Sequence, residues 1–218
     1  MATVKLHYIC DPLCGWCYGA APLALAAQEI DGLDLILHGG GMMTGSNSRT
    51  ITPEWHDYVL PHDRRIAQLS GQPFGERYYE GLLRDTSVVL DSAPPTAAIL
   101  AAQAMADKGM EMLYQIERAH YVSGLKIVDT AVLRQCAEAI GLDGDAFCTE
   151  FAFIRAETLS QHINASRELL AKVRGQGFPT FALEDNHGNF QQIPAANYLG
   201  QVDAWRNMLK QMVNHATA

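Results

Sequence analysis

The sequence has few of the features that mark membrane, nucleic-acid-binding or disulfide-rich proteins. Only 5 of its 218 residues are cysteines and 18% are charged, while 48% are hydrophobic. It has no apolar run near the roughly 20 residues that a membrane-spanning helix needs, and no cluster of lysines or arginines. The formal net charge is −8, from 24 acidic and 16 basic residues. We therefore expect neither a membrane nor a nucleic acid as partner.

The N-terminus also lacks the pattern of a secretory signal. Strand-forming residues begin at Val4, which leaves no room for a basic segment, an apolar segment and a cleavage site. We therefore expect a cytoplasmic location, where thiols are kept reduced and a close cysteine pair is more often catalytic than structural.

Such a pair is present at Cys14 and Cys17, with Gly15 and Trp16 between the two thiols. The preceding run, residues 4–10, is rich in β-branched and aromatic residues and predicts a strand. Residues 18–30 are rich in alanine and leucine and predict a helix. The pair is therefore expected between the end of a strand and the N-terminus of a helix.

This position favours the thiolate form of Cys14. Unpaired N–H groups and the positive end of the helix dipole stabilise an anion at a helix N-terminus. Cysteines in this setting have pKa values of about 3.5 to 7.5, against about 8.5 for a free thiol. We expect Cys14 to be the nucleophile and Cys17, one turn further into the helix, to be the resolving thiol.

A metal site is an alternative interpretation of the same segment. Four side chains could form a ligand set: His7, Cys10, Cys14 and Cys17. Zinc sites of this kind usually need a second ligand pair at matching spacing, and Cys136 and Cys148 do not supply one. We favour redox chemistry, and a redox-sensing or metal-holding interaction protein stays open as an alternative.

The rest of the chain predicts one α/β fold with a helical insertion. Residues 33–38 predict a second strand, which is followed by three glycines, Gly39–Gly41. The glycines suit a tight loop or a place where the backbone approaches the redox site. From about residue 48 to 175 the pattern is helical with no strand between the helices, which are expected over 52–71, 92–108, 110–121, 129–140, 143–151 and 158–174.

Two strands, over 178–183 and 190–193, then predict a hairpin, and an amphipathic helix is expected over 198–213. This order is that of a thioredoxin-like fold with a large all-helical insertion between the second strand and the strand after Pro179. We expect residues 1–43 and 176–218 to form the thioredoxin-like domain and residues 44–175 to form the insertion.

These features resemble the DsbA-like branch of the thioredoxin superfamily over essentially the whole chain. Residues 11–18 are similar to the active-site segment of its FrnE-like cytosolic members, and residues 124–129 and 131–133 resemble a segment of their helical insertion. The resemblance implies a thiol–disulfide oxidoreductase that acts on protein or small-molecule thiols and disulfides, with no organic cofactor and no metal. It also implies a cis peptide bond before Pro179, which would lie against the cysteine pair.

The remaining expectations concern residues around the pair. Trp16, Phe178 and Pro179 are expected to contact substrate, and the residues expected to support the site are Gly15, Asp11 and Tyr18. His7 and His38 are candidates for tuning the thiols. Exported oxidases of the DsbA type have Pro-His where this chain has Gly-Trp, and the histidine helps to stabilise the thiolate. We therefore expect the reduction potential of the cysteine pair to be less oxidising than that of the exported oxidases, about −270 to −180 mV.

A second enzyme class shares this architecture. Kappa-class glutathione transferases and hydroxychromene carboxylate isomerases have the same fold with a helical insertion, and they typically carry serine at the position of Cys14. A glutathione-dependent transferase or isomerase is therefore the second hypothesis, and glutathione is a candidate partner under either one. The sequence leaves the physiological substrate and the direction of electron flow open.

Overall fold

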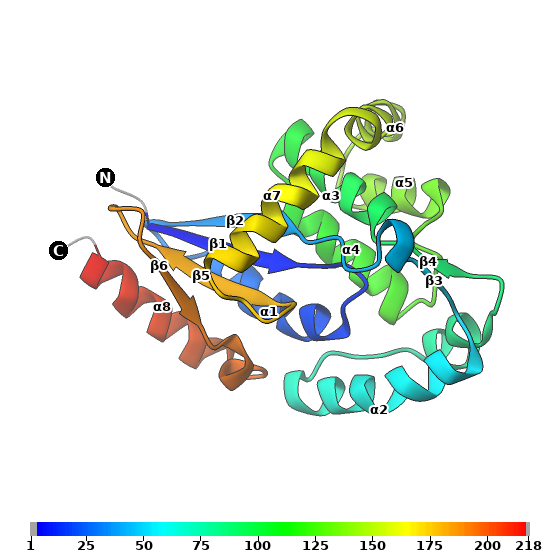
Figure 1. The fold of residues 1–218 in the computed structure, drawn as a ribbon, viewed down its shortest axis with the longest axis horizontal. Coiled ribbons are helices and arrows are strands. Elements are labelled where there is room, and N and C mark those ends of the chain that lie inside the picture. The colour runs from blue at the N-terminus through cyan, green and yellow to red at the C-terminus, as the bar shows by residue number, and fades with distance from the viewer. Residues whose placement is uncertain (1–3, 217–218) are drawn as a thin grey trace.

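A four-stranded mixed sheet forms the centre of the computed structural model, which describes residues 4–216 (Figure 1). The strand order is β2-β1-β5-β6. The first strand, β1 (Val4–Cys10), pairs in parallel with β2 (Leu33–Gly39) and antiparallel with β5 (Thr180–Glu184). β5 then pairs antiparallel with β6 (Phe190–Ile193). The predicted β-α-β unit and hairpin are both confirmed.

Helices cover both faces of this sheet, because the strand side chains alternate between two apolar cores. On one face, Tyr8 of β1 stacks on Phe181, whose ring meets Trp205 of α8 (Val202–Ala216). The indole of Trp205 donates to the Leu23 carbonyl of α1 (Gly15–Gln28), which ties α8 to α1. On the other face, Ile9 packs with Val173 near the end of α7 (Leu159–Lys172), as Figure 1 shows for the helix crossing the sheet.

Five further helices lie beyond the carboxyl ends of β1 and β2 (Figure 1). They are α2 (Pro53–Ser70), α3 (Ala93–Ala106), α4 (Gly109–Tyr121), α5 (Thr130–Ala139) and α6 (Gly144–Phe153). The expected start and stop signals of α2 are confirmed, whereas Asp129, the expected cap of α5, makes no side-chain hydrogen bond to its helix. Thr52 caps α2 by accepting from the Trp55 amide, and Gly71 ends it in the left-handed conformation with φ 74°.

One expectation for this region is wrong. The chain between residues 48 and 175 contains a two-stranded ribbon, β3 (Arg49–Thr50) paired with β4 (Val89–Leu90). Strands of two residues are too short to show alternation, so a pattern search passes over them. The C-terminal helix also begins later than expected, because residues 195–198 form a separate 3-10 turn.

The division of the chain into residues 1–43 with 176–218 and residues 44–175 stays a prediction. Helix α7 lies within residues 44–175, yet it packs on the sheet of the other predicted domain. This contact bears on where the boundary near residue 175 falls. None of the helices between residues 4 and 216 has both the length and the apolar character that a bilayer span requires.

Candidate active site

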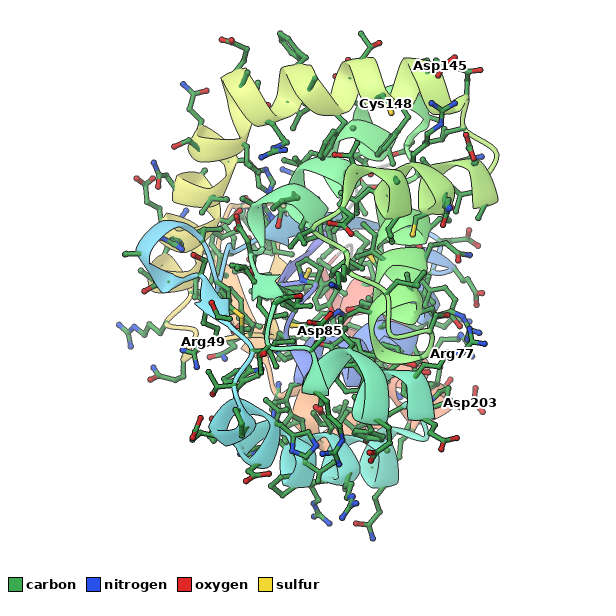
Figure 2. All side chains as sticks on the ribbon, turned by 90° about the vertical axis from the view of Figure 1, so that its right-hand side faces the viewer. Arg49, Arg77, Asp85, Asp145, Cys148 and Asp203 are labelled. Atoms are coloured by element: carbon green, nitrogen blue, oxygen red, sulfur yellow. The ribbon has the colours of Figure 1, made fainter. Side chains whose placement is uncertain are left out.

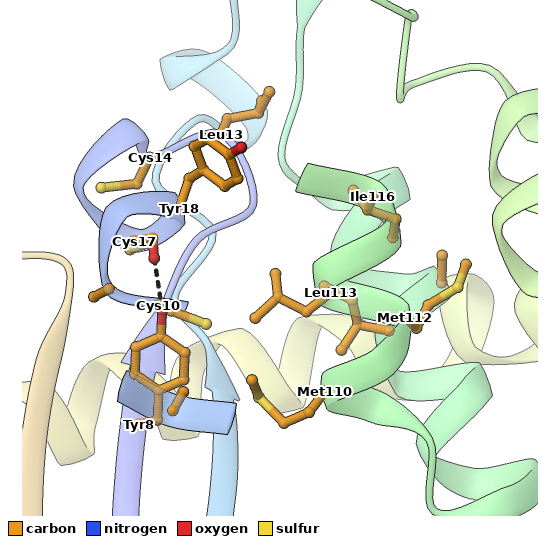
Figure 3. Close-up of a cluster of buried hydrophobic side chains, with 14 of the residues drawn as sticks. Tyr8, Cys10, Leu13, Cys14, Cys17, Tyr18, Met110, Met112, Leu113 and Ile116 are labelled. Carbon is orange, nitrogen blue, oxygen red and sulfur yellow. Dashed lines mark hydrogen bonds between the residues drawn. The ribbon is translucent and has the colours of Figure 1, made fainter. Parts of the chain in front are cut away.

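The two cysteines of the motif lie at the first turn of α1, directly beyond the end of β1 (Figure 3). Cys14 is the N-cap residue, and its carbonyl accepts the amides of Cys17 and Tyr18 at 2.9 and 3.1 Å. No side chain caps this helix end, so the dipole and the free amides of the first turn are available to an anion at Cys14. The predicted helix N-terminus is confirmed.

Exposure separates the two thiols. Cys14 is 7% exposed and lines a cavity, whereas Cys17 is fully buried. The Cys17 sulfur accepts the Asp11 amide at 3.4 Å. Burial, followed by the neighbouring Cys14 thiol, raises the pKa of Cys17 well above the usual range of a cysteine. The buried thiol therefore stays protonated while Cys14 is the thiol that a substrate can reach.

The segment before β5 returns to the cysteine pair. The Cys14 thiol donates to the carbonyl oxygen of Phe178 at 3.4 Å, and the Phe178–Pro179 peptide bond is cis. The Phe178 ring lies over Gly40, where a Cβ atom would come within 2.1 Å of the ring. The glycine loop after β2 is thus a place where backbone closely approaches a residue of the site.

Asp11 connects three segments beneath the thiols. Its carboxylate accepts the Leu13 amide at 2.9 Å, the Met42 amide at 2.6 Å and the Ser92 hydroxyl at 2.8 Å. Burial raises the pKa of Asp11 to about 6, against the opposing effect of these hydrogen bonds and of Arg167. The residue therefore joins the active-site loop, the glycine loop and the start of α3.

Arg167 of α7 holds the glycine loop from the other side. Its guanidinium donates to the Gly40 carbonyl at 3.0 Å and to the Gly41 carbonyl at 2.5 Å. Ser92, in turn, accepts the Met43 amide at 3.0 Å. The loop that contacts Phe178 is thus fixed by two helices that the sequence places more than 45 residues after it.

Gly15 allows α2 to lie directly on the start of α1. A Cβ atom at residue 15 would be 2.8 Å from Oδ1 of Asp63 and 3.1 Å from Cδ1 of Ile66. Asp63 is 4% exposed and accepts the Tyr78 hydroxyl at 2.9 Å. Burial raises the pKa of Asp63 to about 7. A carboxyl group that titrates near neutral pH therefore lies beside the redox motif.

Tyr18 anchors the other side of the first turn. Its hydroxyl donates to the Pro73 carbonyl at 2.7 Å, and its ring stacks on Tyr121 of α4 with centroids 4.8 Å apart. Burial raises the pKa of the Tyr18 hydroxyl. These contacts connect α1 to the segment after α2 and to α4.

Trp16 lies between two cavities. One, of about 200 Å³, is bounded by Cys14, α2 and α4. The other, of about 440 Å³, lies beside Phe178 and Pro179 and is lined mainly by apolar residues from β6 and the turn after it. The half-buried indole of Trp16 contributes to both walls.

Two buried polar residues of α4 near the site were not predicted from sequence. Both carboxyl oxygens of Glu117 are buried and have no hydrogen-bond partner among residues 4–216, and the same holds for Nδ1 of His120. Burial, with Cys14 and Asp11 as weaker causes, raises the pKa of Glu117 well above its usual range. A lone Glu or His in a helical pattern carries no signal of this kind, because helix packing decides where it points.

The two histidines considered for tuning do not contact the thiols. The structure pairs His7 with His38 at 2.9 Å and with Glu184 at 2.9 Å, on the sheet face opposite the cysteines. His7 and the cysteines therefore do not form a common ligand set. Within residues 4–216, no group of three or more His, Cys, Asp or Glu side chains is placed to hold a metal ion.

The two remaining cysteines lie on other helices. Cys136 is buried in α5, and burial raises the pKa of its thiol to about 11. Cys148 is half-buried on α6, at the far end of the helical group from α2 (Figure 2). Only Cys10 accompanies the redox pair, buried at the end of β1 (Figure 3).

A reachable thiol at a helix N-terminus, a buried thiol one turn later and a cis-proline segment against them define a thioredoxin-fold oxidoreductase with a redox-active cysteine pair. Residues 5–202 match the family model of the DSBA-like thioredoxin domain. The chain belongs to that family, and the predicted DsbA-like resemblance is confirmed.

Solved structures give the same assignment. The cytosolic disulfide reductase DsbM from Pseudomonas aeruginosa is 51% identical, with a TM-score of 0.91 over 96% of this chain and 98% of that chain. Its structure with GSH gives 50% identity and a TM-score of 0.89 over 96% and 99%. A candidate protein disulfide isomerase from Nitrosomonas europaea, 24% identical with a TM-score of 0.79 over 98% of each chain, shares the fold. Comparison with curated protein sequences gave no match.

The predicted fold class and the predicted activity are thus both confirmed. The chain is a thiol–disulfide oxidoreductase of the DsbA-like type. The transferase or isomerase hypothesis started from proteins that carry serine at the position of Cys14, whereas both thiols are present here at the first turn of α1.

Proposed function

We propose that the protein works as a disulfide reductase in which Cys14 attacks and Cys17 resolves. The Cys14 thiolate attacks one sulfur of a substrate disulfide, forms a mixed disulfide and displaces the other sulfur as a thiolate. Cys17 then loses its proton and attacks the Cys14 sulfur. The protein ends as the Cys14–Cys17 disulfide, and the substrate leaves as two thiols that carry the two electrons and two protons.

The observation that carries this proposal is the position of Cys14 at an uncapped helix N-terminus, 3.4 Å from the Phe178 carbonyl. The helix end favours the thiolate. The burial of Cys17 supports the second role, because a raised pKa keeps Cys17 from competing for the first attack. Exchange with a pool of small thiols would reduce the pair again for the next cycle.

Three residues are proposed to contact the substrate. Trp16, Phe178 and Pro179 line the cavity of about 440 Å³ next to the cysteines, and its apolar walls suit the side chains of an extended peptide. Asp11, Gly15 and Tyr18 are proposed as supporting residues, since each joins the redox motif to a neighbouring segment.

The relatives support a partner and a location for this chain. The DsbM structure with GSH supports glutathione as a small thiol that acts on this pair. The same relative is a cytosolic reductase, which supports the reductive direction and a cytoplasmic location here. The proposed partners are therefore protein or small-molecule disulfides and glutathione, and neither nucleic acid nor membrane.

The proposal is tested by trapping. Cys17→Ser is expected to accumulate a mixed disulfide with glutathione at Cys14 when mixed with oxidised glutathione, as detected by intact mass and peptide mapping. Cys14→Ser should form none, and Cys148→Ser is the matched control, because this thiol lies on α6 and not on α1. A mixed disulfide that forms on Cys17 in the Cys14→Ser variant, or none at all in either variant, would overturn the assigned roles.

A further inference from the structure

The cavity on the α2 side of Trp16 has an unusual set of polar groups. It is bounded by Cys14 and Trp16 from α1, by one face of α2 and by His120 of α4, and its volume is about 200 Å³. This is smaller than the roughly 300–1,000 Å³ of a typical drug-sized pocket. It suits one short arm of a substrate and not a folded segment of chain.

Two residues that line this cavity, Asp63 and His120, carry hydrogen-bond acceptors. Asp63 uses Oδ2 to accept the Tyr78 hydroxyl, and Oδ1 has no hydrogen bond among residues 4–216. His120 is 4% exposed, and its Nδ1 atom has no partner in the part of the chain that the structure describes. A buried polar atom without a partner is unfavourable, so Nδ1 of His120, in a residue at the cavity wall, points to a ligand that supplies the partner.

The chemistry of the two groups defines the ligand. Burial lowers the pKa of His120 to about 4, so the ring is neutral, and its contact with the Leu125 backbone directs the ring proton there. Nδ1 is then an acceptor. Asp63 supplies a carboxyl group that titrates near neutral pH. Both groups call for a donor, and a positively charged donor satisfies both at once.

The rest of the wall agrees with a cationic ligand. Among the described residues that line the cavity there is no lysine and no arginine, so a carboxylate would meet no counter-charge. Trp55 and Tyr58 add aromatic rings to the wall, and the Trp55 ring already binds one cation, the Arg49 guanidinium, 4.4 Å from its centroid. The formal net charge of −8 acts in the same direction.

We propose that this cavity recognises the primary ammonium group of a small aminothiol disulfide. Asp63 and His120 bind the ammonium group at the end of one arm while Cys14, at the wall of the same cavity, attacks the disulfide. The inference rests on the proposed function and names one of its substrate classes. The electron and proton balance is that of the proposed exchange reaction: two protein thiols become one disulfide, and the substrate disulfide is released as two aminothiols.

Other titratable groups lie around Asp63. They are Tyr78 and Tyr79 on the segment after α2, His62 and Arg64 on α2, and His120 and Tyr121 on α4. Burial raises the pKa of the Asp63 carboxyl to about 7. A bound ammonium group would favour its ionised form.

A pair of matched substrates tests the proposal. Cystamine and bis(2-hydroxyethyl) disulfide have the same length, and they differ in carrying an ammonium or a hydroxyl group at each end. The second-order rate constant for oxidation of the fully reduced protein is measured with each one by following tryptophan fluorescence. We expect the preference for cystamine to exceed that of a small thiol such as dithiothreitol by at least about tenfold, as a buried charge-assisted contact implies. Asp63→Asn should lower the ratio of the two rate constants to the small-thiol value, which is itself above one because cysteamine is the better leaving group.

Two controls separate the possible causes. Asp57→Asn removes the same charge from the exposed face of the same helix, so it should leave the ratio as in the wild type. The pH dependence of the ratio needs no variant. The ratio should rise between about pH 5.5 and 8, because Asp63 ionises in this range while the amine stays protonated. The thiolate fraction of Cys14 enters both rate constants and cancels in the ratio.

The outcomes are distinct. A wild-type ratio no higher than that of the small thiol, or a preference that Asp63→Asn reduces no more than Asp57→Asn does, overturns the ammonium site while the exchange chemistry stands. Failure of the reduced protein to react with the neutral disulfide overturns the proposed function and this inference together. A preference that disappears in Asp63→Asn alone supports the site.

Discussion

The thiol of Cys14 and the carbonyl oxygen of Phe178 are 3.4 Å apart, although 164 positions separate the two residues in the chain. This contact places the reachable sulfur beside the backbone that precedes Pro179, at the boundary between the two cavities. The geometry around this contact leads to four predictions.

Gly40→Ala should disturb the site through Phe178. The new Cβ atom would come within 2.1 Å of the Phe178 ring, so the ring must move from its place beside the Cys14 contact. We expect the rate of mixed-disulfide formation in the Cys17→Ser background to fall about tenfold or more, since small misplacements near reacting atoms are costly. Stopped-flow measurement with oxidised glutathione checks this. Gly81→Ala is the control, because a Cβ atom there meets nothing within 4 Å.

Asp11→Ala should destabilise the protein strongly. The change leaves the amides of Leu13 and Met42 and the hydroxyl of Ser92 without their acceptor. We expect the free energy of unfolding to fall by about 2–5 kcal/mol, measured by urea denaturation. Asp91→Ala removes a carboxylate that accepts one amide, from Ala93, and should cost about 1 kcal/mol or less. Equal losses in the two variants would contradict the role of Asp11.

Gly15→Ala should destabilise the fold although alanine is the better helix former. The propensity gain is about 0.5–1 kcal/mol, whereas overpacking a tight contact costs about 1–3 kcal/mol. The Cβ atom would press on Oδ1 of Asp63 and on Ile66 across the α1–α2 contact. Thermal unfolding should therefore show a lower midpoint than the wild type, and an increase would show that α2 moves away freely.

Asp63 should make the stability of the protein depend on pH between about pH 4 and 7. The folded protein keeps this proton up to about pH 7, whereas the unfolded chain releases it near the ordinary pKa of 3.8. The folded state then binds more protons in this window, so the free energy of unfolding contributed by Asp63 falls as the pH rises through it.

Asp63→Asn removes this loss. Its stability relative to the wild type should increase from about pH 4 to 7 by at most a few kcal/mol and then level off. Urea unfolding at several pH values measures the difference. Asp57→Asn, on the exposed face of the same helix, should show a nearly flat difference, and a flat result for Asp63→Asn as well would contradict the raised pKa.

Much of the redox motif could be read from local sequence. The strand at residues 4–10, the helix after the cysteines, and the strand that follows Pro179 all have local patterns, so their order indicated the fold. Cys14 at the helix N-terminus follows from two adjacent elements. Several of the expected helices between residues 52 and 174 also had a cap or a glycine stop of their own.

The surroundings of the motif could not be read in this way. Asp63, Glu117 and His120 lie in amphipathic helices, where a single polar residue is compatible with the solvent face or the core. Their burial depends on how α2 and α4 pack against α1, a relation with no local signal. The ribbon of β3 and β4 was missed because each strand has only two residues.

The sequence by itself determined the chemistry, because a thiol pair two residues apart at a strand-to-helix junction is a local property of the chain. The tertiary structure alone decided what surrounds that chemistry. Long-range packing buried Cys17, brought Phe178 to Cys14 and placed Asp63 over Gly15. These placements arise from the burial of apolar faces between elements distant in sequence, which gives each polar group its neighbours and hence its charge.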